Sequence, residues 1–290
     1  MEKEEKSKVD KDLELSIEKK FKSLTIRDDF MFCKVMQDAS LCKEVLELVL
    51  NEEIGDIAQI IPQSTIQNSS ETKGVRLDVL AKNTKNDNFN IEMQLMNKDC
   101  IPRRMRYYQA SIDIADLAKN KEYRELPRTI IIFFCLFDPI GKELPVYTFE
   151  NTCREDKNII LNDGTLKIII NVNSYEKCEN KELRELLMYI KDGIVTNDLT
   201  RRIDDMVTKV INDNVALQEY RFVSATIMDA HGEGKKEGIR EGISQGIKEG
   251  IKEGIKEGIL TTAVKMKKAN FDISTIIDMT GLSKQEIEKL

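Results

Sequence analysis

The chain has 290 residues, 41% of them hydrophobic and 33% charged, which is enough to bury one main domain with smaller parts attached. Lysine and arginine number 45 against 51 aspartate and glutamate, so the net charge is −6 and any contact with nucleic acid must come from a local basic patch. No apolar run approaches the roughly 18 residues of a membrane span, so none is expected.

Six cysteines are scattered through the chain without a CxxC pair, which predicts reduced thiols and a cytoplasmic protein rather than disulfides or a zinc site. They are Cys33, Cys42, Cys100, Cys135, Cys153 and Cys178. The single histidine, His231, lies beside glycines in a linker-like stretch, which argues against a histidine-based metal site or triad.

The N-terminal half begins with a charge-rich arm over 1–22, where the sequence lacks the apolar stretch of a secretory signal. Apolar residues in helical spacing then predict a helix over 28–51, with Asp28 or Asp29 as its cap. The next predicted elements are strands over 57–66, 74–82 and 89–96, a hairpin turn over 83–88 and a helix that opens at Pro102.

In the second half, the continuous apolar run 128–138 is typical of a buried central strand. Strands over 146–152 and 166–173 and a helical region from 181 to about 228 follow. This order predicts an α/β fold with a mixed central sheet flanked by helices. We place the main domain at 23–180 and a helical extension at 181–231.

Residues 232–260 repeat glycine every fourth position, usually followed by isoleucine or lysine. A period of four exceeds the 3.6 residues of a helical turn, so the glycine stripe drifts about 40° per repeat around the axis. Glycine costs about 1 kcal/mol in a helix. Such a helix is poor alone, but small glycines permit two copies to approach closely. We interpret the repeat as an oligomerisation helix, with a flexible linker as the alternative.

The tail, 261–290, reads as two or three short helices. Gly281 stops one helix, and Ser283 with Glu286 forms a capping box for the next. This resembles a helix-turn-helix, although a helical hairpin that caps an assembly fits equally well.

The predicted hairpin carries acidic residues within an apolar pattern. Strand alternation puts Val75, Leu77 and Val79 on one face with Arg76 and Asp78 on the other. It likewise places Asn90, Glu92 and Gln94 together on one face of the next strand.

The polar faces of the two strands allow Asp78 and Glu92 to converge. Two close carboxylates repel unless a proton or a cation separates them, and Mg²⁺ or Mn²⁺ is the natural cation for oxygen ligands. The alternative is that these side chains simply form the solvated face of an antiparallel hairpin.

The segments RLDVLA and NIEMQ, the RRMRYY helix and the KEGI repeats together resemble one family. It is the Rpn family of recombination-promoting nucleases and transposases, a branch of the PD-(D/E)XK nucleases. The resemblance covers about residues 24–180, and the repeat-bearing tail also fits. It implies a restriction-endonuclease-like core with a helical tail.

Carried over by position, the resemblance implies that Asp78 and Glu92 bind Mg²⁺ (or Mn²⁺ or Ca²⁺), with the Met93 carbonyl as a third ligand. Gln94 stands where other branches keep lysine, and Leu77 stands where they keep proline. A neutral amide orients water but stabilises charge less than an ammonium. An acid from the first helix often completes such sites, and Asp29 is preferred here.

Two other acids, Glu44 and Glu47, are the alternatives to Asp29. On the helix that opens at Pro102, Arg103, Arg106 and Tyr107 lie within about one turn of each other, where they can contact phosphates. Lys73 and Arg76 can add to this patch. The alternative is an amphipathic helix whose arginines are only solvated.

Two functions compete. The first is a metal-dependent DNA endonuclease that acts in recombination or foreign-DNA turnover and assembles as a homo-oligomer through its tail. The second is a catalytically weak protein that binds DNA or a partner through the same fold. A small-molecule enzyme has little support, because the sequence has no glycine-rich phosphate loop and no nucleophile elbow.

Overall fold

The structure, a computed structural model, describes residues 14–67, 73–97, 100–117 and 120–290; within the long C-terminal helix the side chains of 227–245, 247, 248 and 251 are also outside the description. The chain divides into two compact units, Met1–Arg221 and Phe222–Leu290. The first thirteen residues of the predicted charged arm lie outside the described residues, and 14–22 form a helix.

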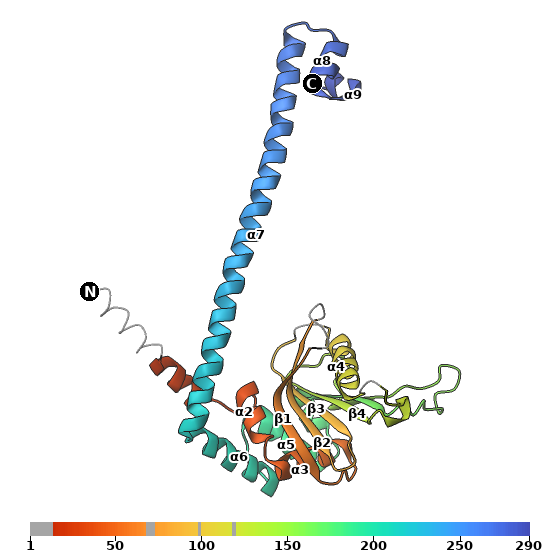
Figure 1. The fold of residues 1–290 in the computed structure, drawn as a ribbon, viewed down its shortest axis with the longest axis vertical. Helices are drawn as coiled ribbons and strands as arrows, with labels where there is room; N and C mark the ends of the chain where they lie inside the picture. Colours follow the sequence, from red (N-terminus) through yellow and green to blue (C-terminus); the bar gives the residue numbers. More distant parts are fainter. Residues whose placement is uncertain (1–13, 68–72, 98–99, 118–119) are drawn as a thin grey trace, which may run out of the picture. The chain divides into compact units, whose positions relative to one another are not determined.

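A six-stranded mixed sheet forms the centre of the first unit (Figure 1). Its strands, in chain order, are β1 (Ile57–Ile66), β2 (Val75–Asn83), β3 (Asn88–Gln94), β4 (Thr129–Cys135), β5 (Val146–Phe149) and β6 (Thr165–Asn171). Across the sheet the order is β1-β2-β3-β4-β6-β5. The β3–β4 and β4–β6 pairs are parallel and the others antiparallel. Every residue of β4 is buried, as its apolar run predicts.

Helices cover both faces of this sheet. One core lies under α2 (Asp29–Val35), α3 (Ala39–Leu50), α5 (Lys181–Asp192) and α6 (Asp198–Ile211). A second, smaller core lies under α4 (Ile101–Asp116) on the other face. Two short 3-10 helices, Tyr123–Glu125 and Val172–Lys177, complete the unit. The predicted α/β fold with a mixed sheet flanked by helices is confirmed.

The single helix predicted over 28–51 is two helices. Asp38 starts the second one: its Oδ1 accepts hydrogen bonds from the backbone N–H groups of Ser40 and Leu41, both at 3.0 Å. An aspartate that satisfies these orphan donors favours a new helix start over continuation of the old one. Asp28 precedes α2 but its carboxylate accepts instead from the backbone of Thr25, at 2.8 Å.

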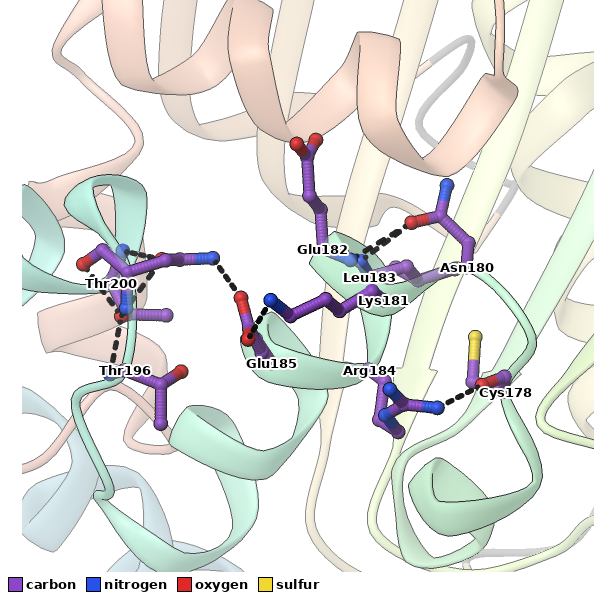
Figure 2. A network of polar contacts seen from close by, with 10 residues as sticks. Cys178, Asn180, Lys181, Glu182, Leu183, Arg184, Glu185, Thr196 and Thr200 are labelled. Atoms are coloured by element: carbon purple, nitrogen blue, oxygen red, sulfur yellow. Dashed lines mark hydrogen bonds and ion pairs between the residues drawn. The ribbon is translucent and has the colours of Figure 1, made fainter.

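Side-chain caps start α5 and α6 and join the two helices to each other (Figure 2). Asn180 accepts from the first turn of α5, and Asn197 accepts from the backbone N–H of Thr200 at 2.8 Å. The amide of Asn197 also donates to Glu185 at 2.9 Å, which joins the two helices. Because α5 and α6 contribute buried leucine and isoleucine to the main core, residues 181–211 belong to the same compact unit as the sheet.

The C-terminal part is helical. It consists of α7 (Asn214–Lys268), which contains the tetrad repeat, α8 (Ile273–Thr280) and α9 (Lys284–Glu288). Gly281 ends α8 with a φ of +73°, which glycine adopts without strain. Ser283 and Glu286 form the predicted capping box of α9. In the described part of the chain, no helix has a segment long and apolar enough to cross a membrane.

Candidate active site

The hairpin ladder between β2 and β3 stops where the two acids begin. Its paired residues run from Lys82 with Asn88 to Val79 with Ile91. Beyond that pair, hydrogen bonds from the backbone to side chains replace the backbone-to-backbone hydrogen bonds of the hairpin. The backbone N–H of Asp78 donates to Glu92 Oε1, and the backbone N–H of Met93 donates to Asp78 Oδ2, both at 3.0 Å. Each acid therefore satisfies the main chain of the other strand.

The alternation of β2 breaks at Asp78. Val75 and Leu77 pack in the core under α4, whereas Val79 packs in the core on the opposite face. The expectation that all three share one face is therefore wrong. In the neighbouring strand β1, Gln63 lies between the residues that pair with Leu77 and Val79, and it has a left-handed φ of +49°. The left-handed backbone of Gln63 thus lies beside the point where the face of β2 changes.

Burial and mutual repulsion set the charge of the two acids. Burial, followed by the nearby charge of Asp29, raises the pKa of Asp78 to about 6. The Met93 N–H, Arg104 and Arg76 act in the opposite direction. Burial and the charge of Asp78 raise the pKa of Glu92, which is 1% exposed, well above its usual value. Burial and mutual repulsion thus make it costly for both acids to carry their negative charge at the same time.

A third oxygen faces the same place. The Gln94 carbonyl accepts from Leu136 N–H at 2.9 Å, on the side of β4. Successive peptide groups of a strand point to alternate neighbours, so the N–H and the carbonyl of Met93 both point toward β2. The described residues contain no group of three or more Asp, Glu, His or Cys side chains that could hold a metal ion. The oxygens that could hold a cation here are the two carboxylates and the Met93 carbonyl, which the strand geometry directs toward β2.

The three candidates for an additional acid lie in different places. Asp29, exposed in the first turn of α2, is near enough for its charge to raise the pKa of Asp78. Glu44 forms an ion pair with Arg202, and Glu47 accepts the backbone N–H of Ile54 at 3.1 Å. Of the three, only Asp29 is brought toward Asp78.

Arg104 is the residue that the sequence reasoning missed. Its Nη1 donates to Gln94 Oε1 at 2.7 Å, and its Nη2 donates to the Tyr108 hydroxyl at 3.0 Å. Its charge also acts on both acids. In the sequence it is one of three arginines in the run RRMR. The signal that singles it out is its spacing from Tyr108, one helical turn later on the face that meets the sheet.

Comparison with known proteins assigns the part of the chain that carries this site to a family. The model of the PD-(D/E)XK nuclease family transposases matches residues 27–214, more than half of the chain. The chain belongs to this family. The matched range contains the whole sheet, the acids and Arg104. Neither the curated proteins nor the solved structures gave a significant match.

The residues predicted to contact nucleic acid are exposed on two elements, α4 and β2. Arg103, Arg106 and Tyr107 are exposed on α4, and Arg76 is exposed on β2 close enough to lower the pKa of Asp78. The Tyr107 hydroxyl donates to the Lys73 carbonyl at 2.6 Å, which ties α4 to the segment that leads into β2. Arg103, Arg106 and Tyr107 thus lie on α4, whereas Arg76 alternates with Val75 and Leu77, which pack under α4, and so belongs to the opposite face of the sheet.

A cavity of about 720 Å³ lies elsewhere in the domain, between α3, α5 and α6. Acidic side chains dominate its lining, among them Glu44, Glu53 and Glu182. Its negative charge repels phosphates, and neither Asp78 nor Glu92 lines it. For a nuclease-family domain the large cavity is therefore a poor candidate for the nucleic-acid site.

Proposed function

We propose that this protein is a metal-dependent DNA endonuclease that hydrolyses phosphodiester bonds at Asp78 and Glu92. Family membership supports nuclease chemistry. The observation that carries the assignment is the exchange of hydrogen bonds between the two acids and each other's strands. It holds two carboxylates together at a break in the sheet, where a purely structural hairpin would continue its ladder.

The residues present fit a divalent cation. The oxygens of Asp78, Glu92 and the Met93 carbonyl are the hard ligands that Mg²⁺, Mn²⁺ and Ca²⁺ take. A bound cation would offset the repulsion that, together with burial, raises the pKa of both acids. When bound, such an ion polarises the phosphoryl group and lowers the pKa of a water molecule. In this proposal Asp29, whose charge reaches Asp78, acts on the ion through a bridging water and not as a third direct carboxylate ligand.

The other residues of the site orient the reactants. Gln94 presents its amide beside Glu92 and orients the attacking water by hydrogen bonding. Water adds to phosphorus and releases a proton, while the phosphorus bond to the leaving oxygen breaks and that oxygen takes up a proton. Arg76, Arg103, Arg106 and Tyr107 position the backbone of the DNA.

In this proposal the C-terminal helical region mediates formation of a homo-oligomer. Cutting both strands of a duplex requires two active sites or two successive nicks, so a homo-oligomer formed through the α7 repeat brings a second site to the same DNA. In this proposal the protein acts in recombination or in the turnover of foreign DNA, as the transposase family suggests.

Cleavage of supercoiled plasmid tests the proposal. Full-length protein is incubated with EDTA, Mg²⁺ or Mn²⁺, and compared with Asp78→Asn and Glu92→Gln. The matched control is Asp113→Asn, because Asp113 is another half-buried acid, on α4 itself, hydrogen-bonded to Gln109 and Thr129. We expect metal-dependent nicking that both site variants lose and the control keeps.

Two results would overturn the proposal. Cleavage that survives both substitutions would move the chemistry away from this hairpin. A wild-type protein that cleaves under no metal, yet still binds DNA or assembles, would favour the catalytically weak binding protein instead.

A further inference from the structure

The pattern that names the family, PD-(D/E)XK, ends on lysine, but this chain has Gln94 at that position. The amide is neutral, so it cannot offset the charge that develops on a phosphate in the transition state. The hydrogen bond from Arg104 to Gln94 brings a permanent cation to the same position. In this chain the positive charge is therefore provided by Arg104 of α4 and not by a residue of β3.

Arg104 is held by neutral partners. Its guanidinium lies over the rings of Tyr108 and Phe133, at 5.5 and 5.4 Å from their centres. Phe133 is the β4 residue directly beside Glu92 in the sheet. Among the described residues no ion pair includes Arg104. The charge of Arg104 reaches Asp78 and Glu92, but no carboxylate contacts the stacked guanidinium as an ion pair, so its charge is not neutralised by direct contact.

Donor groups also remain for that ligand. An arginine has five N–H donors, and the hydrogen bonds to Gln94 and Tyr108 use two of them. The side chain of Arg104 is only half-buried, and its neighbours Arg103 and Arg106 on α4 are exposed. A planar donor fork at the edge of a basic surface matches a phosphate group.

We propose that Arg104 contacts the scissile phosphate and supplies the positive charge that lysine supplies in the family pattern, with Gln94 holding it in place. The inference rests on the proposed nuclease function. Arg104 stays protonated throughout and moves no proton; it stabilises negative charge on the non-bridging oxygens. Because Gln94 Oε1 accepts from Arg104, the Gln94 amide nitrogen points away from the guanidinium and can donate to the attacking water.

A charge swap tests this pairing. Arg104→Met removes the cation, and we expect kcat to fall by about a hundredfold to a thousandfold. Gln94→Lys alone places two cations within hydrogen-bond distance and should also impair cleavage. The double variant Gln94→Lys, Arg104→Met restores one cation on the strand, as in the family pattern. We expect it to cleave at least about tenfold faster than Arg104→Met.

Salt dependence of DNA binding gives a readout that needs no cleavage. Affinity of full-length protein for a fluorescent duplex is measured in EDTA at several salt concentrations. A residue that contacts phosphate reduces the salt slope by about one when its charge is removed. We expect this for Arg104→Met and no change for Arg201→Met, an exposed arginine on α6 whose side chain is 66% accessible. Circular dichroism checks that each variant is folded.

The outcomes separate the two proposals. An unchanged slope in folded Arg104→Met, or a double variant no faster than Arg104→Met alone, overturns the role of Arg104. A wild-type protein without metal-dependent cleavage overturns the nuclease proposal. In that case the salt slope still decides whether Arg104 binds phosphate.

Discussion

Asp78 and Glu92 each accept a hydrogen bond from the main chain of the other's strand, at 3.0 Å in both directions. Neither side chain can rotate away without leaving an N–H group of the sheet unpaired, which costs about 1–3 kcal/mol when buried. The backbone therefore holds the two carboxylates close together although their charges repel. Measurable properties of the protein follow because these backbone hydrogen bonds act against the repulsion between the two carboxylates.

Removing one charge should stabilise the metal-free protein. Asp78→Asn keeps an acceptor for the Met93 N–H but removes a carboxylate whose pKa is raised to about 6. Since a shift of one pKa unit corresponds to about 1.4 kcal/mol, we expect a gain of up to about 3 kcal/mol at pH 8. Urea unfolding measures it. Asp78→Ala leaves the Met93 N–H unpaired, so its gain in stability should be smaller. An equal loss of stability in both variants would contradict repulsion between Asp78 and Glu92.

Stability of the metal-free protein should fall as pH rises through the acidic range. The folded pKa of Asp78, about 6, exceeds its ordinary value of 3.8, so the folded state binds more protons between these values. Stability is then highest below about pH 4 with respect to this group and is lost as pH rises through about 6. The raised pKa of Glu92 acts in the same direction. Thermal unfolding between pH 4 and 8 should show a smaller decline for Asp78→Asn than for the wild type.

Asp29→Asn should shift this pH window. The charge of Asp29 is the second cause of the raised pKa of Asp78, after burial. Without it the pKa of Asp78 should fall toward its ordinary value and the decline in stability should begin and end at lower pH. Carbon-detected NMR titration of the Asp78 carboxyl measures this directly. Glu44→Gln, which changes an acid of the separate cavity, serves as the control.

A divalent metal ion should offset the destabilisation that the two close carboxylates cause in the metal-free protein. At pH 8, a ligand at 100 times its Kd stabilises the folded state by about 2.7 kcal/mol. We expect Mg²⁺ or Mn²⁺ to raise the Tm of the wild type and of Asp113→Asn, and to leave Asp78→Asn and Glu92→Gln unchanged. Differential scanning calorimetry with and without the metal tests this. A rise of the same size in all four proteins would place the metal elsewhere.

The repeat glycines distinguish a lone helix from an assembled one. A Cβ added at Gly250 or Gly254 meets nothing within 4 Å in this chain. In a lone helix, Gly250→Ala with Gly254→Ala should stabilise by about 1 kcal/mol per site. If copies pack closely through these glycines, the same substitutions should weaken association. Light scattering after size-exclusion chromatography, with circular dichroism for helicity, separates the two cases.

Much of the domain could be predicted from periodicity. The apolar run of β4 and the alternation of β3, with Ile91 and Met93 on one side and Glu92 on the other, survive in the structure because both strands are regular there. The approach of Asp78 to Glu92 was predicted from regular alternation in both strands. It arises instead at an irregular position, because Val79 has crossed to the other face.

Other features depend on tertiary geometry. Which of three neighbouring arginines reaches Gln94 depends on how α4 is rotated over the sheet, and a run of basic letters does not encode that rotation. The helix predicted over 28–51 is divided because the Asp38 side chain accepts two backbone hydrogen bonds, from Ser40 and Leu41. These bonds favour the start of a second helix over continuation of the first. Propensity alone does not separate an aspartate that begins a helix from one that lies within it.

The parallel pairing of β3 with β4 has a consequence for synthesis on the ribosome. Asp29, Asp78, Glu92 and Arg104 all precede β4, so a chain that ends before Thr129 already contains every group proposed to act on DNA. It lacks Phe133, over which the Arg104 guanidinium lies, and the strand that completes the centre of the sheet. In the proposed nuclease, an unfinished chain therefore holds the groups of the site without the strand beside which Arg104 lies, and the site is complete only when β4 joins the sheet.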